Sequence, residues 1–321
     1  MPNPETRLEY LARIASLYYD QRKTQQEVAD EIGITRSTVS RLLSESQEKG
    51  IVEHIVHYPW RTNPVLEKAL ITTFQLKDAI VLSRQNKSYE EMLSGIGYLG
   101  GQYFLKQLKL NSKVGISWGT GLHQLIKALR PMSRPDVEII QLIGGTGSEA
   151  GSQIGPLIAP MLANTMGCTC RYIHAPLMME NELGRDTLLQ EKSIRETLQY
   201  AEKCNIALVG IGSTNPLYYN PYKLGYVTEN EIVEIAKEGG VGSTCGEIFN
   251  IKGELLDIDI NRRIVGVSLE TLSKIEYVIG VAGGALKAEA ILGALHGKIV
   301  NVLITDDQAA ETIMKLKDHL K

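Results

Sequence analysis

The sequence has little that would build a metal site or a disulfide framework. Its 321 residues include four cysteines, with no C-x-x-C pair and no histidine nearby at metal-ligand spacing. We expect reduced, mostly buried thiols at Cys168, Cys170, Cys204 and Cys245. The C-x-C spacing of the first two leaves half of a metal site as the alternative. We predict no metal and no other cofactor.

Long apolar runs and an excess of positive charge are also missing. No stretch approaches the roughly 20 apolar residues that a membrane-spanning helix needs, and MPNPETRLEY lacks the apolar core of a signal peptide. We therefore expect a cytoplasmic protein without a membrane partner. The net charge of −3 is unfavourable for a nucleic-acid-binding protein, because neutralising phosphates usually supplies much of the affinity. Any DNA binding must be explained locally.

What is present is an ordinary globular composition, 43% hydrophobic and 22% charged, in a chain long enough for two unequal domains. Two helices are predicted near the N-terminus. Helical spacing over residues 6–19 places on one face Leu8, Leu11, Ala12, Ala15 and Tyr18 or Tyr19. Thr24 can cap the next helix, with Glu27 completing a capping box, and Gly33 ends it.

The third helix begins at Thr35 or Ser37 and ends at Gly50. It must cross the second helix closely, which requires a small residue such as Ala29 at the contact. The remaining contacts come from apolar side chains, namely Val28, Ile32, Ile34, Val39 and Leu42. This pattern predicts a helix-turn-helix over residues 24–49.

In such a unit the second helix faces the DNA backbone and the third enters the major groove. Arginine can contact guanine or hold a phosphate, and serine and threonine suit either role. The expected DNA-binding residues are Gln25, Thr35, Arg36, Ser37, Ser40 and Arg41. The alternative is that the arginines are only solvated surface charges. Because residues 1–58 hold seven Lys or Arg against nine Asp or Glu, a balance of −2, we expect several copies to act together on one operator.

Residues 51–58 alternate apolar and polar side chains, which predicts a short strand or wing with His54 and His57 exposed. Pro59 and Pro64 then interrupt the pattern. We predict a winged helix-turn-helix domain over residues 1–58 and a second domain over 59–321. In the second domain short apolar runs alternate with amphipathic helical segments, which indicates a Rossmann-like α/β fold with a largely parallel sheet.

Four glycine-rich loops follow predicted strands, at residues 117–121, 144–147, 210–214 and 282–284. Ligands of such sheets bind at the carboxyl ends of the strands, where glycine lets backbone amides approach an anion. The alternative is that each glycine only makes a tight turn. Neither the dinucleotide fingerprint nor a Walker lysine is present.

These loops and nearby polar turns supply the candidate effector-binding residues, which are Gly119, Thr120, Gly121, Gly144, Gly145, Thr146, Gln153, Gly212, Ser243 and Lys287. Lys287 is the cation best placed to meet a phosphate or sugar oxygen. An exposed helix lysine is the alternative for it.

The whole chain resembles the SorC family of sugar-responsive bacterial transcriptional regulators, through LYYDQRKTQQEVADEIGITRSTVSRLL, VGISWGTG, QLIGG, NIALVGIG, VGSTCGEIFN and VAGGALKAEAILGALHGKIVNVLITD. The second domain looks like a relative of the glucosamine-6-phosphate deaminase and ribose-phosphate isomerase folds. The resemblance implies a homotetramer, an operator near a carbohydrate operon, and a sugar or sugar phosphate as effector. Ser243 and Asn250 depart from the acidic residues that many members carry, which we expect to alter hydroxyl preference. Ile143 leaves no lysine to capture an aldehyde at that strand end.

We therefore expect a transcriptional regulator, a repressor or an activator, that is nucleoid-associated when bound to its operator. The alternative is a sugar-phosphate isomerase or deaminase with an accessory DNA-binding domain. Such an enzyme needs a general base, whereas the four loops contain no Asp, Glu or His, although His123 and Glu149 lie just beyond two of them. We expect no catalytic residues. A constitutive architectural protein would leave the ligand cleft unexplained.

Overall fold

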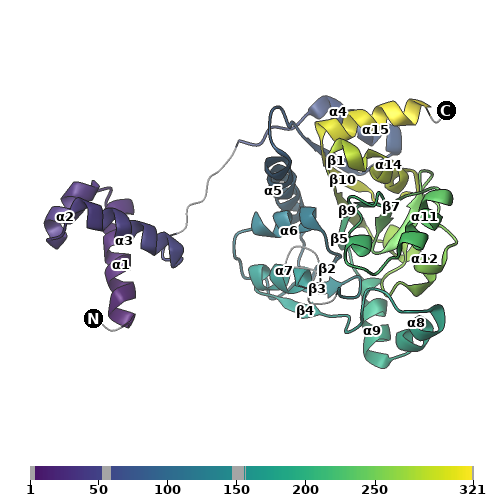
Figure 1. The fold of residues 1–321 in the computed structure, drawn as a ribbon, viewed down its shortest axis with the longest axis horizontal. Helices are drawn as coiled ribbons and strands as arrows, with labels where there is room; N and C mark the ends of the chain where they lie inside the picture. The colour runs from purple at the N-terminus through teal and green to yellow at the C-terminus, as the bar shows by residue number, and fades with distance from the viewer. Residues whose placement is uncertain (1–3, 53–58, 147–154, 156, 320–321) are drawn as a thin grey trace. The chain divides into compact units, whose positions relative to one another are not determined.

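The computed structural model describes residues 4–52, 59–146, 155 and 157–319. It forms two compact units, Met1–Pro59 and Trp60–Lys321. The first unit contains α1 (Pro4–Tyr19), α2 (Gln25–Ile32) and α3 (Arg36–Glu48) (Figure 1). Thr24 and Glu27 form the expected capping box, Gly33 ends α2 with φ 78°, and the Thr35 side chain caps α3. The predicted helix-turn-helix is thus present, with its predicted caps.

The core of the first unit is made by one face of each helix, Leu11, Ile14, Leu17, Val28, Ala29, Val39, Leu42 and Leu43. The predicted apolar face of α1 is partly wrong, because Leu8 is 48% exposed and Ala12 is also exposed. Packing against α3 selects the adjacent stripe instead, and the ion pair between Arg7 and Glu45 joins the same two helices at the surface. Residues 51 and 52 form a bend, and the rest of the predicted wing lies outside the described residues.

The second unit is built on a seven-stranded sheet in the order β1-β10-β9-β5-β2-β3-β4. All of its neighbouring strands pair in parallel, which confirms the predicted fold class. Its strands are β1 (Asp78–Leu82), β2 (Lys113–Ile116), β3 (Glu138–Gln141), β4 (Thr169–Arg171), β5 (Ile206–Gly210), β9 (Tyr277–Val281) and β10 (Val302–Asp306). The central strands are almost wholly apolar because helices cover both faces of the sheet.

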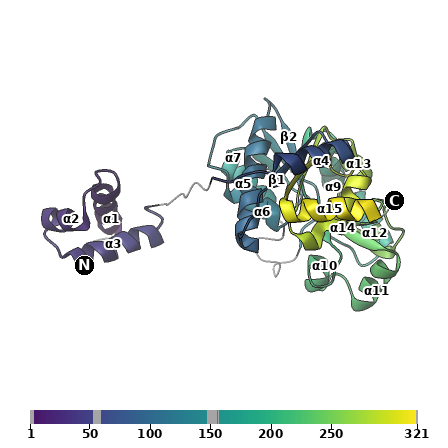
Figure 2. The ribbon, with the colours of Figure 1, turned by 90° about the horizontal axis from the view of Figure 1, so that it is seen from above.

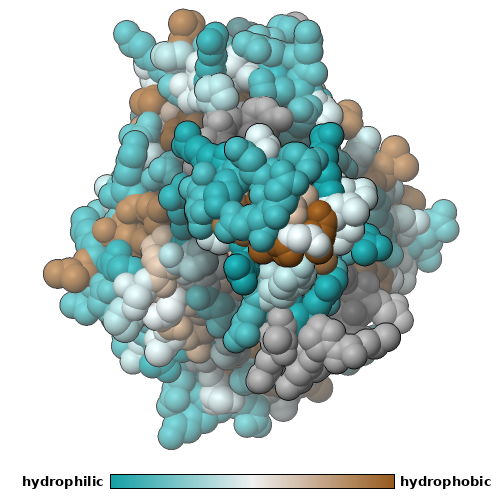
Figure 3. Space-filling model, turned by 90° about the vertical axis from the view of Figure 1, so that its left-hand side faces the viewer, coloured by the Kyte–Doolittle hydropathy of each residue, from teal (hydrophilic) through white to brown (hydrophobic). Residues whose placement is uncertain are grey.

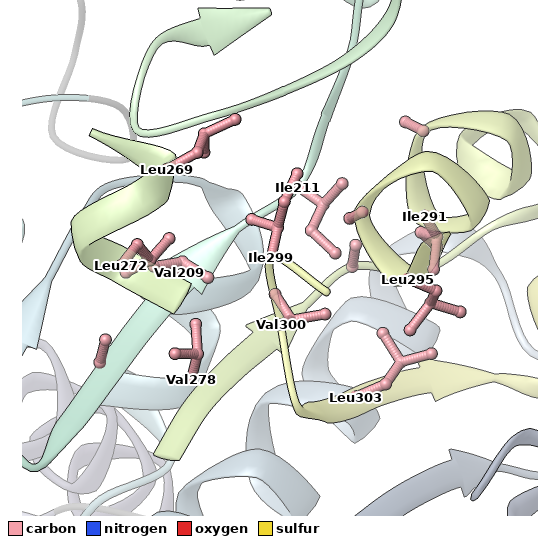
Figure 4. Close-up of a cluster of buried hydrophobic side chains, with 14 of the residues drawn as sticks. Val209, Ile211, Leu269, Leu272, Val278, Ile291, Leu295, Ile299, Val300 and Leu303 are labelled. Atoms are coloured by element: carbon pink, nitrogen blue, oxygen red, sulfur yellow. The ribbon is translucent and has the colours of Figure 1, made fainter. Parts of the chain in front are cut away.

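One face of the sheet is covered by α4 (Pro64–Phe74), α14 (Ala288–His296) and α15 (Asp307–His319), and the other by α5 (Tyr89–Gln107), α6 (Thr120–Lys127) and α7 (Ile158–Met166) (Figures 1 and 2). On the first face, Val209 and Val278 lie beside Leu272 of α13 (Leu269–Ser273) (Figure 4). Ile211 and Val300 lie between this group and Ile291 and Leu295 of α14. These two apolar layers hold the carboxyl ends of the strands at one rigid edge, where the glycine-rich loops leave the sheet.

A second, antiparallel sheet of three short strands was not predicted. It consists of β6 (Gly212–Ser213), β7 (Gly240–Thr244) and β8 (Glu247–Asn250). Cys245 and Gly246 form the turn between β7 and β8 with φ 50° and 86°, the positive angles that a two-residue hairpin turn requires. The helices that accompany this sheet and the edge of the large one are α8 (Glu182–Leu189), α9 (Lys192–Ala201), α10 (Asn220–Lys223), α11 (Glu229–Lys237), α12 (Asp259–Arg263), α13 (Leu269–Ser273) and the short 3-10 helix η2 (Ala285–Lys287).

The face drawn in Figure 3 is largely hydrophilic, with apolar side chains in small separate groups. Within the described part of the chain, no helix is long and apolar enough to cross a membrane.

Candidate functional site

A pocket of about 80 Å³ lies at the carboxyl edge of the parallel sheet. Its walls come from the loops after β2, β5 and β9, three strands that are adjacent in the sheet. The turn of the small sheet and the segment around α10 close the remaining sides. Parallel strands bring their carboxyl ends to one edge, so residues far apart in sequence meet here. The space suits several waters or a small metabolite group.

The β2 side of the pocket is built from backbone. Gly119 precedes α6 with φ 150° and no side chain caps that helix, so the first amides of α6 remain available for a ligand. Close packing favours Gly121, because an added Cβ would lie 3.1 Å from the carbonyl oxygen of Val281. The hydroxyl of Ser117 accepts a hydrogen bond from the Gly210 amide at 3.2 Å, which ties the β2 and β5 loops together. The result is a fixed cradle of amides at a helix N-terminus, which favours anions.

Lys287 supplies positive charge to this cradle. It ends η2, and its amide donates to the Gly284 carbonyl at 3.0 Å. Its side chain is half-buried and lines the pocket. Burial lowers the pKa of Lys287, since a desolvated ammonium is disfavoured. Among the described residues its ammonium has no hydrogen-bond or ion-pair partner, and none of the described lining residues is Asp, Glu or His.

Other lining residues of the pocket are aromatic or apolar. Ile143 and Cys245 line it, and the tip of the Ile143 side chain lies beside Gly246. Trp118 and Tyr219 also line the pocket, and the indole N–H of Trp118 is buried without a partner among the described residues. A buried N–H donor of this kind is satisfied by a ligand or a water. The Tyr219 hydroxyl is also buried without a partner among the described residues. These residues thus offer two donors, an indole N–H and a phenol O–H, beside apolar side chains.

The structure brings together six of the predicted effector-binding residues, which line the pocket: Gly119, Thr120, Gly121, Gly212, Ser243 and Lys287. Gly144, Gly145 and Thr146 are not among its described lining residues. The Gly145 amide donates to the Ala175 carbonyl at 2.9 Å, and a Cβ at Gly144 would lie 2.2 Å from the Pro176 carbonyl oxygen. Gly144 thus allows a close approach of two backbone segments, a role that neither the predicted ligand contact nor the alternative of a tight turn describes. Gln153 lies outside the described residues.

Several lining residues were missed by the sequence analysis, namely Trp118, Tyr218, Tyr219, Asn220 and Cys245. Trp118 lies inside the glycine-rich loop at residues 117–121, so its position in the sequence already pointed to the pocket. The others reach the pocket through the unpredicted small sheet and α10, and no local pattern marks them.

Other sequence expectations change as well. Asn250 does not line the pocket. Its side chain instead holds the turn after β8 by accepting from the amides of Lys252 and Glu254. Of the two departures from the family pattern, only Ser243 is placed to affect a ligand.

His123 is buried within α6, outside the described lining residues, and burial lowers its pKa. Of the four cysteines, Cys204 and Cys245 are buried but Cys168 and Cys170 are only half-buried.

The candidate DNA-contacting surface lies on the helix-turn-helix. Thr35, Arg36, Ser37, Ser40 and Arg41 are exposed, and Gln25 is half-buried. Thr35 is engaged locally, with its hydroxyl 2.9 Å from those of Ser37 and Thr38.

The exposed arginines differ from other cations of this unit. Arg7 pairs with Glu45 and Lys23 with Glu31, whereas neither Arg36 nor Arg41 has a side-chain partner within the described part of the chain. Gln25 and Arg36 also line one shallow hollow, together with Tyr18, Thr24 and Gln26. Two unpaired guanidinium groups on α3, the helix expected to enter the major groove, are suited to phosphates or base edges.

Comparisons with known proteins cover both units. Residues 9–59 match the Crp-like helix-turn-helix domain and residues 60–315 match the Sugar-bind family model, a sugar-binding domain. The chain is 31% identical over 311 residues to the sorbitol operon regulator of Klebsiella pneumoniae, covering 96% of this chain and 98% of the relative. It is 31% identical over 300 residues to the deoxyribonucleoside regulator of Bacillus subtilis, covering 94% and 95%.

Solved structures give the same result. The full-length regulator SorC from Klebsiella pneumoniae superposes with a TM-score of 0.73 at 30% identity, covering 96% of this chain and 99% of that one. A DeoR family transcriptional regulator from Listeria monocytogenes has a TM-score of 0.72 at 29% identity, covering 78% and 98%. These relatives are regulators, which argues against the enzymatic alternative. The chain belongs to the SorC family of sugar-responsive bacterial transcriptional regulators.

Proposed function

We propose that this protein regulates a carbohydrate operon and that a phosphorylated sugar, bound at Lys287, sets its affinity for the operator. The observation that carries the proposal is the half-buried side chain of Lys287, whose ammonium is unpaired among the described residues, in a pocket without a described carboxylate. Partial desolvation of a cation without a partner is unfavourable, and an anionic ligand offsets that cost. A neutral sugar would not.

The assignment of individual groups follows from their positions. The amides of Gly119, Thr120 and Gly121 and the Lys287 ammonium hold the phosphate. The sugar part of the ligand is bound by Ser243, the Gly212 amide and the indole N–H of Trp118. Its less polar side faces Ile143 and Cys245. Gly144, Gly145 and Thr146 support the pocket from outside rather than contact the ligand.

On the DNA side, Arg36 and Arg41 contact the operator, with Gln25, Thr35, Ser37 and Ser40 around them. The helix-turn-helix has no excess of positive charge, so affinity depends on several copies bound together. We therefore propose a homo-oligomer, a tetramer as the family resemblance implies, that acts in the cytoplasm and joins the nucleoid through its operator.

Control requires that the ligand bind two arrangements of the oligomer unequally. Filling the pocket then changes the relative placement of paired DNA-binding units, and with it the affinity for two half-sites.

Thermal shift with matched ligand pairs tests the proposal. The pairs are glucose and glucose 6-phosphate, sorbitol and sorbitol 6-phosphate, and 2-deoxyribose and 2-deoxyribose 5-phosphate. Ligands that bind the native state raise its melting temperature, and we expect this only from phosphorylated members, with inorganic phosphate as a weak competitor. A shift produced by neutral sugars alone would show that the pocket does not select an anion.

A further inference from the structure

A buried carboxylate lies behind the pocket and is not accounted for by ligand binding. Asp306 ends β10 and is 0% exposed. One carboxylate oxygen accepts from the Gly284 amide at 2.5 Å, and the other accepts from the amides of Gln308 and Ala309 at 3.1 and 3.3 Å. The carboxylate thus joins the loop after β9 to the first turn of α15.

Toward the pocket, the hydrogen bond of Asp306 holds the turn that carries Lys287. The Gly284 amide donates to Asp306, and the Gly284 carbonyl accepts from the Lys287 amide at 3.0 Å. Space around the loop is minimal, because a Cβ at Gly283 would lie 2.8 Å from the same Asp306 oxygen. A displacement of Lys287 and its turn is therefore transmitted to Asp306 rather than absorbed by a gap.

On the other side, the first turn of α15 holds the end of β1. Asp307 accepts from the Arg84 amide at 3.0 Å, and the Arg84 guanidinium donates to the Gln308 side chain at 2.6 Å. Arg84 follows β1 closely in the chain.

The end of β1 in turn holds the first residues of the second unit. The Ser83 amide donates to the Arg61 carbonyl and the Asn63 amide donates to the Val81 carbonyl, both at 2.8 Å. Between these two hydrogen bonds, Thr62 forms an isolated antiparallel β-bridge with Leu82. Residues 61–63 are thus hydrogen-bonded to β1 immediately after the chain leaves the DNA-binding unit, which ends at Pro59.

We propose that Asp306 is a positioning residue that couples the effector pocket to residues 61–63, the segment through which the chain enters the sugar-binding unit. An anion that draws Lys287 toward it moves the Gly284 turn. The hydrogen bonds of Asp306 carry this movement to the start of α15, and those of Asp307 and Arg84 carry it to residues 61–63. The inference rests on the proposed anion site at Lys287.

Hydrogen exchange on the full-length protein tests this coupling, with inorganic phosphate as the probe. In the wild type, phosphate should slow exchange in peptides covering 282–288, next to the anion, and in peptides covering 61–63 and 81–84. We expect the distant effect to be about five-fold, the lower end of ordinary coupling between sites.

Asp306→Asn is the variant of choice, because it keeps the size of the side chain but replaces one acceptor oxygen with an NH₂ group. Phosphate should still slow exchange at 282–288 in this variant, while the effect at 61–63 is lost. Asp136→Asn is the matched control. Asp136 also accepts a backbone amide, that of Asn111, but lies before β3, four strands away from β10 in the sheet. It should leave both effects unchanged.

If Asp306→Asn does not fold, Asp307→Ala is the second variant, because it removes the acceptor of the Arg84 amide and leaves Asp306 in place. In this variant too, phosphate should slow exchange at 282–288 but no longer at 61–63. Protection at 61–63 that persists in a folded variant would overturn the inference. So would wild-type protection confined to 282–288. An absence of protection at both places would mean that the anion site itself is wrong, and the coupling with it.

Discussion

Replacing Lys287 with methionine separates ligand binding from folding. Methionine keeps most of the length and apolar contact of the lysine stem but removes the ammonium. A hydrogen bond to a charged group contributes about 1.5–3 kcal/mol, so the affinity for a sugar phosphate should fall by about 10- to 150-fold. Lys237, exposed in the last turn of α11, provides the control Lys237→Met.

The readout is the ligand-induced shift in melting temperature. At a ligand concentration near 100 times the wild-type Kd, binding stabilises the protein by about 2.7 kcal/mol. A domain of this size gains roughly 2–4 °C per kcal/mol, so the wild-type shift should be roughly 5–11 °C. At the same concentration Lys287→Met should retain only about 0.3–1.4 kcal/mol.

Without ligand, the same substitution should not lower stability. Burial lowers the pKa of Lys287, so the folded state disfavours its charged form. Below the folded pKa the lysine is protonated in both states and its burial cost reduces stability. That cost is relieved as pH rises from the folded pKa toward the unfolded value of about 10.4. Lys287→Met should therefore melt at the same or a higher temperature at pH 7, with the difference narrowing at alkaline pH. An unchanged ligand shift in a folded variant would refute the anion site.

Other substitutions test the remaining parts of the account. Arg36→Ala and Arg41→Ala should each weaken operator binding by about 1–3 kcal/mol in an electrophoretic mobility assay, with ligand-induced melting shifts unchanged; equal loss of both activities would indicate misfolding. Thr24→Ala should cost the helix-turn-helix about 1 kcal/mol in denaturant unfolding by removing its cap, and an unchanged midpoint would contradict the capping role. Gly144→Ala should lower the melting temperature sharply, since its Cβ would meet the Pro176 carbonyl at 2.2 Å; a neutral effect would mean that the two segments separate easily.

Much of the helix-turn-helix could be predicted from sequence because its signals are local. The capping box at Thr24, the glycine that ends α2 and the small Ala29 act within one or two turns. The buried face of α1 was less accessible to prediction, since two neighbouring stripes are both apolar and only packing against α3 selects between them.

The pocket could be located but not fully described. Glycines after parallel strands mark the carboxyl edge of the sheet. The sequence does not show, however, whether such a glycine lines an anion site or allows two backbone segments to pack closely. Gly119 faces the pocket, whereas Gly144 faces the Pro176 carbonyl. Residues such as Tyr219 and Cys245 arrive from a separate antiparallel sheet, whose short strands have no distinct periodicity. Tertiary packing alone decides which polar residues meet there.

Operator binding with and without ligand tests the central claim most directly. Fluorescence anisotropy of labelled DNA from upstream of the neighbouring genes, at fixed salt, would be measured with the sugar phosphate that gives the largest melting shift. The account predicts that this ligand changes operator affinity by at least about five-fold, and that Lys287→Met abolishes the change at the same ligand concentration. A ligand that binds the pocket tightly yet leaves operator affinity unchanged would contradict it.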